Sequence, residues 1–226
     1  MRKEADRMKL EKGQKLLFIG DSITDYGRSP AGENNSPYAD WGEGYPSIVR
    51  GHLISFYPEL GIRVVNKGTG GNQTRDLIAR WDEDVMALKP DWVSILIGTN
   101  DVWRRFDAPV MTERHVSIQE YEDNMRWMID RTLPMTKNIV LMSPYFMEPN
   151  REDPMRVAMD AEVAVCKKLA EEYGLIFVDL QAEFDRIMEH VHPMAISWDY
   201  IHPGPIGRVL IANKFLEAVG AIQTNQ

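Results

Sequence analysis

This chain of 226 residues has almost no cysteine, no long apolar run and no excess of positive charge. Its one cysteine, Cys166, cannot form an internal disulfide, and no group of Cys and His residues has the spacing of a structural zinc site. No apolar run approaches the roughly 18 residues of a membrane span. The start, MRKEADRMKLEKGQ, is too charged for a secretory signal. The sequence therefore predicts a cytoplasmic protein that is not bound to a membrane.

The shortage of positive charge also bears on the partner. There are 26 Lys and Arg residues against 34 Asp and Glu, a net charge of −8. A protein that holds nucleic acid through its phosphates needs the opposite balance, so nucleic acid is not expected as a partner. Apolar residues make up 44% of the chain, enough at this length for one large core. We predict a flexible lead-in over residues 1–14, with Met8 as an alternative start, and a single domain over residues 15–226.

Short apolar runs rich in β-branched residues alternate with longer segments of helical periodicity. The runs are KLLFI from 15, IRVVN from 62, WVSILI from 92, NIVLM from 138 and LIFVD from 175. Runs of this kind are typical of buried parallel strands. Their alternation with helices predicts a three-layer α/β/α sandwich around a central, mostly parallel, five-stranded sheet. In such a sheet the functional residues gather beyond the carboxyl ends of the strands.

Polar and glycine-rich segments follow three of these runs. They are GDS at 20–22, GTGGN at 68–72 and GTND at 98–101, and a fourth motif, DYIH at 199–202, lies near the end of the chain. Together these segments contain a hydroxyl, an imidazole, a carboxylate and several hydrogen-bond donors. These are the groups that a serine hydrolase needs.

The hydroxyl of Ser22 is a candidate nucleophile. A serine attacks at neutral pH only if a base within hydrogen-bond reach accepts its proton, and His202 is the candidate base. A carboxylate three positions earlier, Asp199, can hold the other ring nitrogen and so fix the tautomer. Because His202 precedes Pro203, we expect it in an extended turn where a last helix begins.

The attacked carbonyl becomes an oxyanion, and each preorganised donor aimed at it is worth about 10²- to 10³-fold in rate. We assign three donors: the backbone N–H of Ser22, the backbone N–H of Gly71, and the side-chain amide of Asn100. Gly70 is an alternative to Gly71, although the spacing after the second strand favours Gly71. With either glycine as the donor, the reaction needs no metal or other cofactor.

The combination of motifs resembles the SGNH, or GDSL-type, hydrolase family over nearly the whole chain. The first block is GDSIT, with Ile23 where leucine is usual, and the G-x-N-D and D-x-x-H blocks are intact at 98–101 and 199–202. The resemblance implies a flavodoxin-like SGNH hydrolase fold and a serine esterase.

Within that family, GIRVVNKG and KPDWVSILIGTNDVWR are most similar to the intracellular bacterial acetylxylan esterases. Members of that group deacetylate short xylo-oligosaccharides and form homo-oligomers. The resemblance therefore implies an acetylated xylo-oligosaccharide, or another small acetyl ester, as substrate, and a homo-oligomer.

Side chains beside the motifs are candidates for substrate contact. These are Asp21, Trp103, Trp198 and Tyr200, and the irregular loop over residues 28–44 is a candidate rim of the site. Aromatic faces suit flat sugar rings, although tryptophans can also simply anchor loops. For Asp21 the alternative is that its carboxylate accepts hydrogen bonds from the amides of its own turn, and Asp101 invites the same interpretation. Further aromatic residues near the strand ends are Tyr26, Trp41 and Tyr45.

Other functions fit less well. The glycines at 68–71 do not complete a dinucleotide fingerprint, because Gln73 stands where a further glycine is required. Asp199 and His202 could ligate a metal, but no third ligand is evident. A lysophospholipase or thioesterase would use the same chemistry, yet the polar composition of the loop over residues 28–44 favours a sugar. A non-catalytic carbohydrate-binding subunit would not need the intact set of catalytic residues.

The remaining notable side chains have structural interpretations. Trp81, Trp92 and Trp127 fall on apolar faces or in a strand and are expected in the core. Arg104 and Arg105 are expected to be solvated or ion-paired at the surface. Cys166 lies on the apolar stripe of a helix, where a buried, inert thiol is expected.

Overall fold

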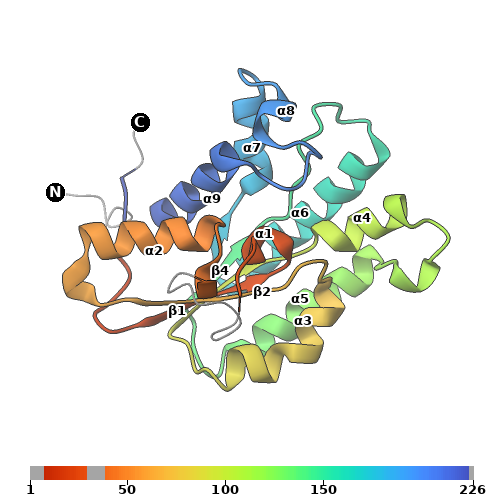
Figure 1. Ribbon diagram of the computed structural model, residues 1–226. Coiled ribbons are helices and arrows are strands. Elements are labelled where there is room, and N and C mark those ends of the chain that lie inside the picture. The colour runs from red at the N-terminus through yellow and green to blue at the C-terminus, as the bar shows by residue number, and fades with distance from the viewer. Residues whose placement is uncertain (1–7, 30–38, 224–226) are drawn as a thin grey trace.

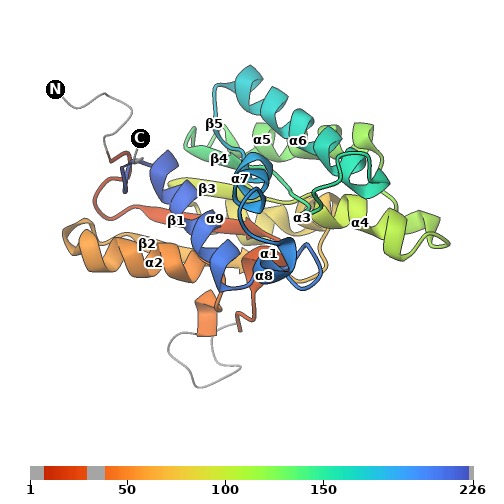
Figure 2. The ribbon, with the colours of Figure 1, turned by 90° about the horizontal axis from the view of Figure 1, so that it is seen from above.

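A parallel sheet forms the centre of the computed structural model, which describes residues 8–29 and 39–223. The sheet is seen in Figure 1, and Figure 2 labels its strands in the order β2-β1-β3-β4-β5, in which every neighbouring pair is parallel. The strands are β1 Lys15–Gly20, β2 Arg63–Gly68, β3 Trp92–Leu96, β4 Ile139–Met142 and β5 Ile176–Val178. Each of them falls within, or overlaps, one of the five apolar runs, so the predicted sheet is confirmed.

Helices cover both faces of the sheet. They are α1 Ser22–Asp25, α2 Tyr45–Phe56, α3 Thr74–Trp81, α4 Thr99–Asp107, α5 Ile118–Thr132, α6 Pro154–Tyr173, α7 Leu180–Met188, α8 Pro193–Ile196 and α9 Pro205–Ala218. Short turns of other helix types are η2 Ala39–Trp41, η3 Pro58–Leu60, η4 Asp82–Met86 and η5 Thr112–Arg114. Helices α2, α7 and α9 pack on one face and α3, α5 and α6 on the other, which confirms the three-layer sandwich (Figures 1 and 2).

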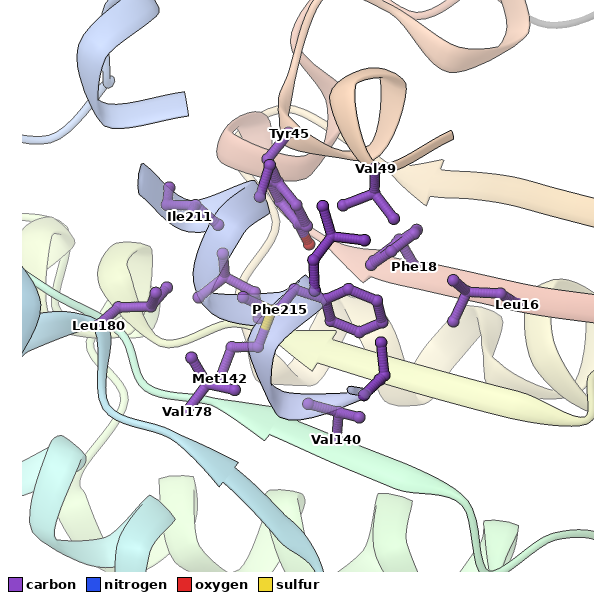
Figure 3. Close-up of a cluster of buried hydrophobic side chains, with 14 of the residues drawn as sticks. Leu16, Phe18, Tyr45, Val49, Val140, Met142, Val178, Leu180, Ile211 and Phe215 are labelled. Carbon is purple, nitrogen blue, oxygen red and sulfur yellow. The ribbon is translucent and has the colours of Figure 1, made fainter. Parts of the chain in front are cut away.

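Strand β1 shows why two helical layers are needed. Its side chains alternate between the faces: Leu16 and Phe18 join one apolar cluster, and Leu17 and Ile19 join the other. Figure 3 shows the first cluster, where the ring centroid of Phe18 lies 4.9 Å from that of Phe215 on α9. Because both faces of the strand are apolar, each must be covered, and the sandwich follows.

Two expectations concern the ends of the chain. Residues 1–7 of the expected lead-in lie outside the described residues. Within residues 8–14, Leu10 is only 3% exposed and the N–H of Lys9 donates to the carbonyl of Val219, whereas residues 11–13 are exposed. The last helix begins at Pro205 rather than Pro203, because Gly204 is extended and forms its N-cap. Pro205 fits the first turn, where its missing N–H costs nothing.

Only two of the three tryptophans expected in the core are buried. Trp81 and Trp92 are buried as predicted, whereas Trp127 is 40% exposed, so that prediction was wrong. The buried stripe of α5 follows Met125, Met128 and Ile129, and Trp127 points away from it. None of the helices within the described ranges is long and apolar enough to cross a membrane.

Candidate active site

The four motifs meet at the carboxyl edge of the sheet. Strands β2, β1 and β3 are neighbours, so the segments that follow them lie side by side. Figure 2 shows α1, which carries Ser22, and α4, which carries Asn100, at the same end of the sheet. A Cβ atom on Gly68 would lie 2.1 Å from the backbone N of Asp25. Glycine at this position therefore lets the end of β2 approach α1.

Ser22, His202 and Asp199 form one hydrogen-bonded series. The Oγ of Ser22 lies 2.8 Å from Nε2 of His202, and Nδ1 of the same ring lies 2.6 Å from Oδ2 of Asp199. An ionised carboxylate can only accept hydrogen bonds, so Nδ1 must carry the proton. Nε2 is then the acceptor for the serine hydroxyl, which is the tautomer that a general base requires.

Asp199 is held as an anion. Burial alone would raise the pKa of its carboxyl, but hydrogen bonds from the ring and backbone N–H of His202, from the N–H of Ile201 and from the hydroxyl of Ser197 outweigh it and lower the pKa below its ordinary value. These donors also fix the orientation of the carboxylate. A negative charge beside Nδ1 stabilises the imidazolium that would form when His202 takes a proton.

Two backbone donors face no competing acceptor. In the part of the chain that the structure describes, the N–H groups of Ser22 and Gly71 donate no hydrogen bond, whereas the N–H of Gly70 donates to Oδ2 of Asp25 at 3.0 Å. Gly71 has a φ of +77°, in the left-handed region that glycine enters readily. Of the two adjacent glycines, Gly71 is therefore the one whose N–H is available.

Asn100 is 2% exposed, and its amide is anchored at both ends. Its Nδ2 donates to the carbonyl of Asn72 at 3.0 Å and to Oδ2 of Asp21 at 3.3 Å, and its Oδ1 accepts from Nη2 of Arg104 at 2.8 Å. Arg104 forms the ion pair expected of it, with Asp107, but the contact with Asn100 was not foreseen. The amide nitrogen of Asn100 thus faces Asp21, the residue that precedes Ser22.

Asp21 lies beneath the site and does not line it. It is 1% exposed, and its Oδ1 accepts from the N–H of Ile23 at 2.9 Å. Burial raises the pKa of its carboxyl to about 6, although the hydrogen bond from the N–H of Ile23 acts in the opposite direction. Both of its oxygens already accept hydrogen bonds inside the protein, from the N–H of Ile23 and from Nδ2 of Asn100, which disfavours the expected contact between Asp21 and substrate. Its hydrogen bond within the turn matches the alternative interpretation.

The aromatic candidates occupy different positions. The ring centroid of Trp103 lies 5.9 Å from that of His202, and Trp198 is 75% exposed. Tyr200 packs beside Phe146, with ring centroids 6.2 Å apart. Tyr45 is fully buried and takes no part in a rim, because it packs edge-on against Phe18 in the core.

The loop expected to form a rim is described only in part. Residues 30–38 lie outside the described residues. Trp41 anchors the remainder, since its indole N–H donates to the carbonyl of Val64 at 2.8 Å. Glu43, from the end of the loop, lines a cavity of about 550 Å³ together with Ser22, Asp25, Tyr26, Gly27 and His202.

Tyr26, which the sequence marked only as an aromatic residue near a strand end, makes a contact with the residue after His202. Its hydroxyl donates to the carbonyl of Pro203 at 2.6 Å, which ties the end of α1 to the residue after His202. Arg208 lies over the ring at 4.5 Å. No local sequence signal marks this contact, because it joins residues 177 positions apart.

Two more carboxyl groups are buried behind the site. Asp101 accepts from the N–H and hydroxyl of Thr74 at the start of α3, a contact between two helices that was not expected from the sequence. Burial raises its pKa to about 7, although the bonds from Thr74 act in the opposite direction. Burial also raises the pKa of Glu162 well above its ordinary value, and this carboxyl lies 3.8 Å from Arg105. Within residues 8–29 and 39–223, no three His, Cys, Asp or Glu side chains cluster to hold a metal ion.

A serine, histidine and aspartate in series above a parallel sheet of this order define a serine hydrolase of the SGNH type. The chain belongs to the GDSL-like Lipase/Acylhydrolase family, whose family model matches residues 18–209. That span includes Ser22, Asp199 and His202.

An esterase is among the relatives of this chain. The chain is 51% identical to the acetylxylan esterase of Geobacillus stearothermophilus over 214 residues. These residues make up 94% of this chain and 97% of the relative. A solved structure of a catalytic mutant of that esterase, with a serine replaced by alanine, matches with a TM-score of 0.90 and 50% identity over 94% of this chain and 97% of that one. Other catalytic mutants of the same esterase replace an aspartate and the histidine three positions after it.

A third relative comes from another source. It is an alpha/beta hydrolase enzyme from the metagenome of Lake Arreo, Spain, with a TM-score of 0.92 and 46% identity over 96% of this chain and 100% of that one. The fold and the esterase chemistry implied by the sequence are thereby confirmed.

From the burial of these carboxyls we expect the free energy of unfolding to depend on pH. The folded protein raises the pKa of Asp101 from 3.8 to about 7, so between these values the folded state keeps a proton that the unfolded chain releases. The contribution of Asp101 to the free energy of unfolding is therefore full below about pH 4 and is lost as the pH rises toward 7. At 1.36 kcal/mol per pKa unit, we expect a loss of up to about 4 kcal/mol.

Asp101→Asn, which keeps an oxygen for Thr74, should remove this part of the pH dependence. Urea unfolding of the variant and the wild type at several pH values between about 4 and 8 measures it. The control is Asp123→Asn, which changes an exposed carboxyl on α5. If the free energy of unfolding changed with pH in the same way in the wild type and in Asp101→Asn, Asp101 would not titrate in this range.

Proposed function

We propose that this protein is a serine esterase that removes O-acetyl groups from acetylated xylo-oligosaccharides. The observation that carries the proposal is the hydrogen-bonded series from Ser22 through His202 to Asp199, with distances of 2.8 and 2.6 Å. The substrate class rests on the 51% identity to an acetylxylan esterase over nearly the full length of both chains.

The first half of the reaction acetylates Ser22. Its Oγ attacks the acetyl carbonyl carbon while Nε2 of His202 takes the hydroxyl proton. The carbonyl oxygen becomes an oxyanion, which the N–H groups of Ser22 and Gly71 and the amide of Asn100 stabilise. As the C–O bond to the sugar breaks, Nε2 returns its proton to the sugar oxygen. The deacetylated sugar leaves, and an acetyl ester remains on Ser22.

Water completes the cycle. Nε2 of His202 takes a proton from water as the water oxygen attacks the acetyl carbon. The same donors hold the second oxyanion, whose collapse breaks the bond to Oγ of Ser22. Nε2 then gives the proton back to Oγ, and acetate is released. No step needs a cofactor or a metal ion.

The surroundings of the serine favour a small polar ester. The cavity beside it is lined by the carboxylates of Asp25 and Glu43 as well as by Tyr26, a lining suited to hydroxyl groups rather than to a long acyl chain. Trp103, Trp198 and Tyr200 are the proposed contacts for the sugar rings. These features favour a carbohydrate esterase over a lysophospholipase or thioesterase.

Two finer parts of the proposal concern the cell and the assembly. We propose a cytoplasmic location and a homo-oligomer, both by resemblance to the intracellular acetylxylan esterases. Recovery of the native protein from outside the cell would contradict the cytoplasmic location. Sedimentation of the purified chain as a monomer would contradict the homo-oligomer.

Replacing any member of the catalytic series should abolish turnover without unfolding the chain. We expect Ser22→Ala and His202→Ala to lower kcat by at least about 10⁴-fold and Asp199→Ala by somewhat less. Acetate release from acetylated xylo-oligosaccharides and from an aryl acetate measures the loss, with thermal unfolding as the check on folding. A folded Ser22→Ala protein with near-normal turnover would refute the nucleophile.

The exposed tryptophan offers a separate test of the sugar contact. Trp198→Ala should raise KM for acetylated xylo-oligosaccharides by about 10-fold, from the lost contact with a sugar face, and leave the aryl acetate unaffected. Trp127→Ala is the matched control, since Trp127 is 40% exposed on α5 and outside the site. Equal KM effects on both substrates, or none on either, would contradict a role for Trp198 in binding sugar.

A further inference from the structure

A side-chain amide can serve an oxyanion in only one of two orientations. The nitrogen of Asn100 donates hydrogen bonds and its oxygen only accepts them, while a half-turn about the last side-chain bond exchanges the two ends with little change of shape. A flipped amide would present its oxygen, and repel the developing negative charge. Something must therefore hold the orientation of Asn100.

Arg104 supplies that constraint. It lies one helical turn after Asn100 on α4, and its Nη2 donates to Oδ1 of Asn100 at 2.8 Å. A guanidinium has five N–H donors and no acceptor, so it can partner only the oxygen end of the amide. At the opposite end, the carbonyl of Asn72 accepts from Nδ2 at 3.0 Å, which requires the same orientation.

Arg104 is itself fixed in place. Its guanidinium forms an ion pair with Asp107, and it lies over the ring of Trp103 at 4.8 Å. Trp103 in turn lies edge-on to His202, with ring centroids 5.9 Å apart. The side chain of Arg104 is only 15% exposed, so the charge acts on the amide with limited screening by water.

We propose that Arg104 is a positioning residue that sets the orientation of Asn100 and strengthens its donation to the oxyanion. The positively charged guanidinium of Arg104, hydrogen-bonded to Oδ1, draws electron density from the amide. This makes the N–H groups of Nδ2 better donors. The present acceptors of Nδ2 are a neutral carbonyl and a carboxyl oxygen at 3.3 Å, and an oxyanion would compete well with both. This inference rests on the proposed esterase function.

The neighbouring arginine provides a matched control. Arg105 lies on the same helix, but its guanidinium faces Glu162 on α6 at 3.8 Å instead of Asn100. The variants Arg104→Met and Arg105→Met remove the same charge from adjacent positions. Only the first removes the donor to Asn100.

Because an oxyanion donor acts in the transition state, its loss should appear in kcat. With an aryl acetate as substrate, we expect Arg104→Met to lower kcat about 10- to 100-fold, less than the 10²- to 10³-fold of a deleted donor, with KM within about twofold. Arg105→Met should leave both constants near the wild-type values. Thermal unfolding shows whether each variant remains folded.

A double-mutant cycle separates positioning from a general structural effect. In an Asn100→Ala background, Arg104→Met should cost less than about twofold in kcat, since the amide through which it acts is absent. A loss in that background equal to the loss in the wild type would overturn the proposal. So would an unchanged kcat for a folded Arg104→Met variant.

A spectroscopic measurement keeps this test independent of the proposed function. The side-chain NH₂ signal of Asn100 is identified as the one missing from the nitrogen–proton spectrum of Asn100→Ala. Its exchange with solvent should quicken at least about 10-fold in Arg104→Met and stay unchanged in Arg105→Met. If the wild type failed to hydrolyse any acetyl ester, the esterase function would fall. Unchanged exchange in Arg104→Met would refute the positioning role alone.

Discussion

The hydrogen bond between Ser22 and His202 joins residues 180 positions apart in the chain, and the rest of the site is organised around it. It can form because β1 delivers Ser22 to the carboxyl edge of the sheet while the segment before α9 returns to the same edge. Tyr26 reinforces this meeting, since its hydroxyl holds the carbonyl of Pro203 next to His202. The covered sheet thus supplies a rigid base on which a small number of hydrogen bonds fix the reacting atoms.

Beneath the reacting groups lies a layer of buried polar side chains. Asp21 connects the turn of Ser22 with the amide of Asn100. Asp101, the next residue on α4, connects that helix with the start of α3 at Thr74. Their burial favours the neutral carboxyl, whereas Asp199, with four donors around it, remains an anion. The same type of side chain therefore serves as a structural link or as the charged member of the proposed catalytic series, according to its donors and its burial.

Much of this arrangement could be predicted from the sequence. The apolar runs are local signals and predicted the five strands of the described residues. The short motifs after them pointed to Ser22 and Asn100 as candidates, and the fold brings these two residues to the same edge of the sheet. Contacts made by packing between distant elements could not be predicted. The burial of Asp21, the hydroxyl contact of Tyr26 and the bond from Arg104 to Asn100 depend on how a side chain sits against another element. A charged or polar side chain beside a motif can look like a ligand contact in the sequence and still lie in the core.

The central claim is that Ser22 carries the acetyl group between the two halves of the reaction. Rapid acid quenching of the enzyme during turnover of an aryl acetate, followed by mass spectrometry of the peptide that contains Ser22, tests this directly. We expect this peptide to gain the mass of one acetyl group in the wild type and not in Ser22→Ala. Sustained turnover with no acetylated peptide, or acetylation of a different residue that follows the kinetics of turnover, would contradict it.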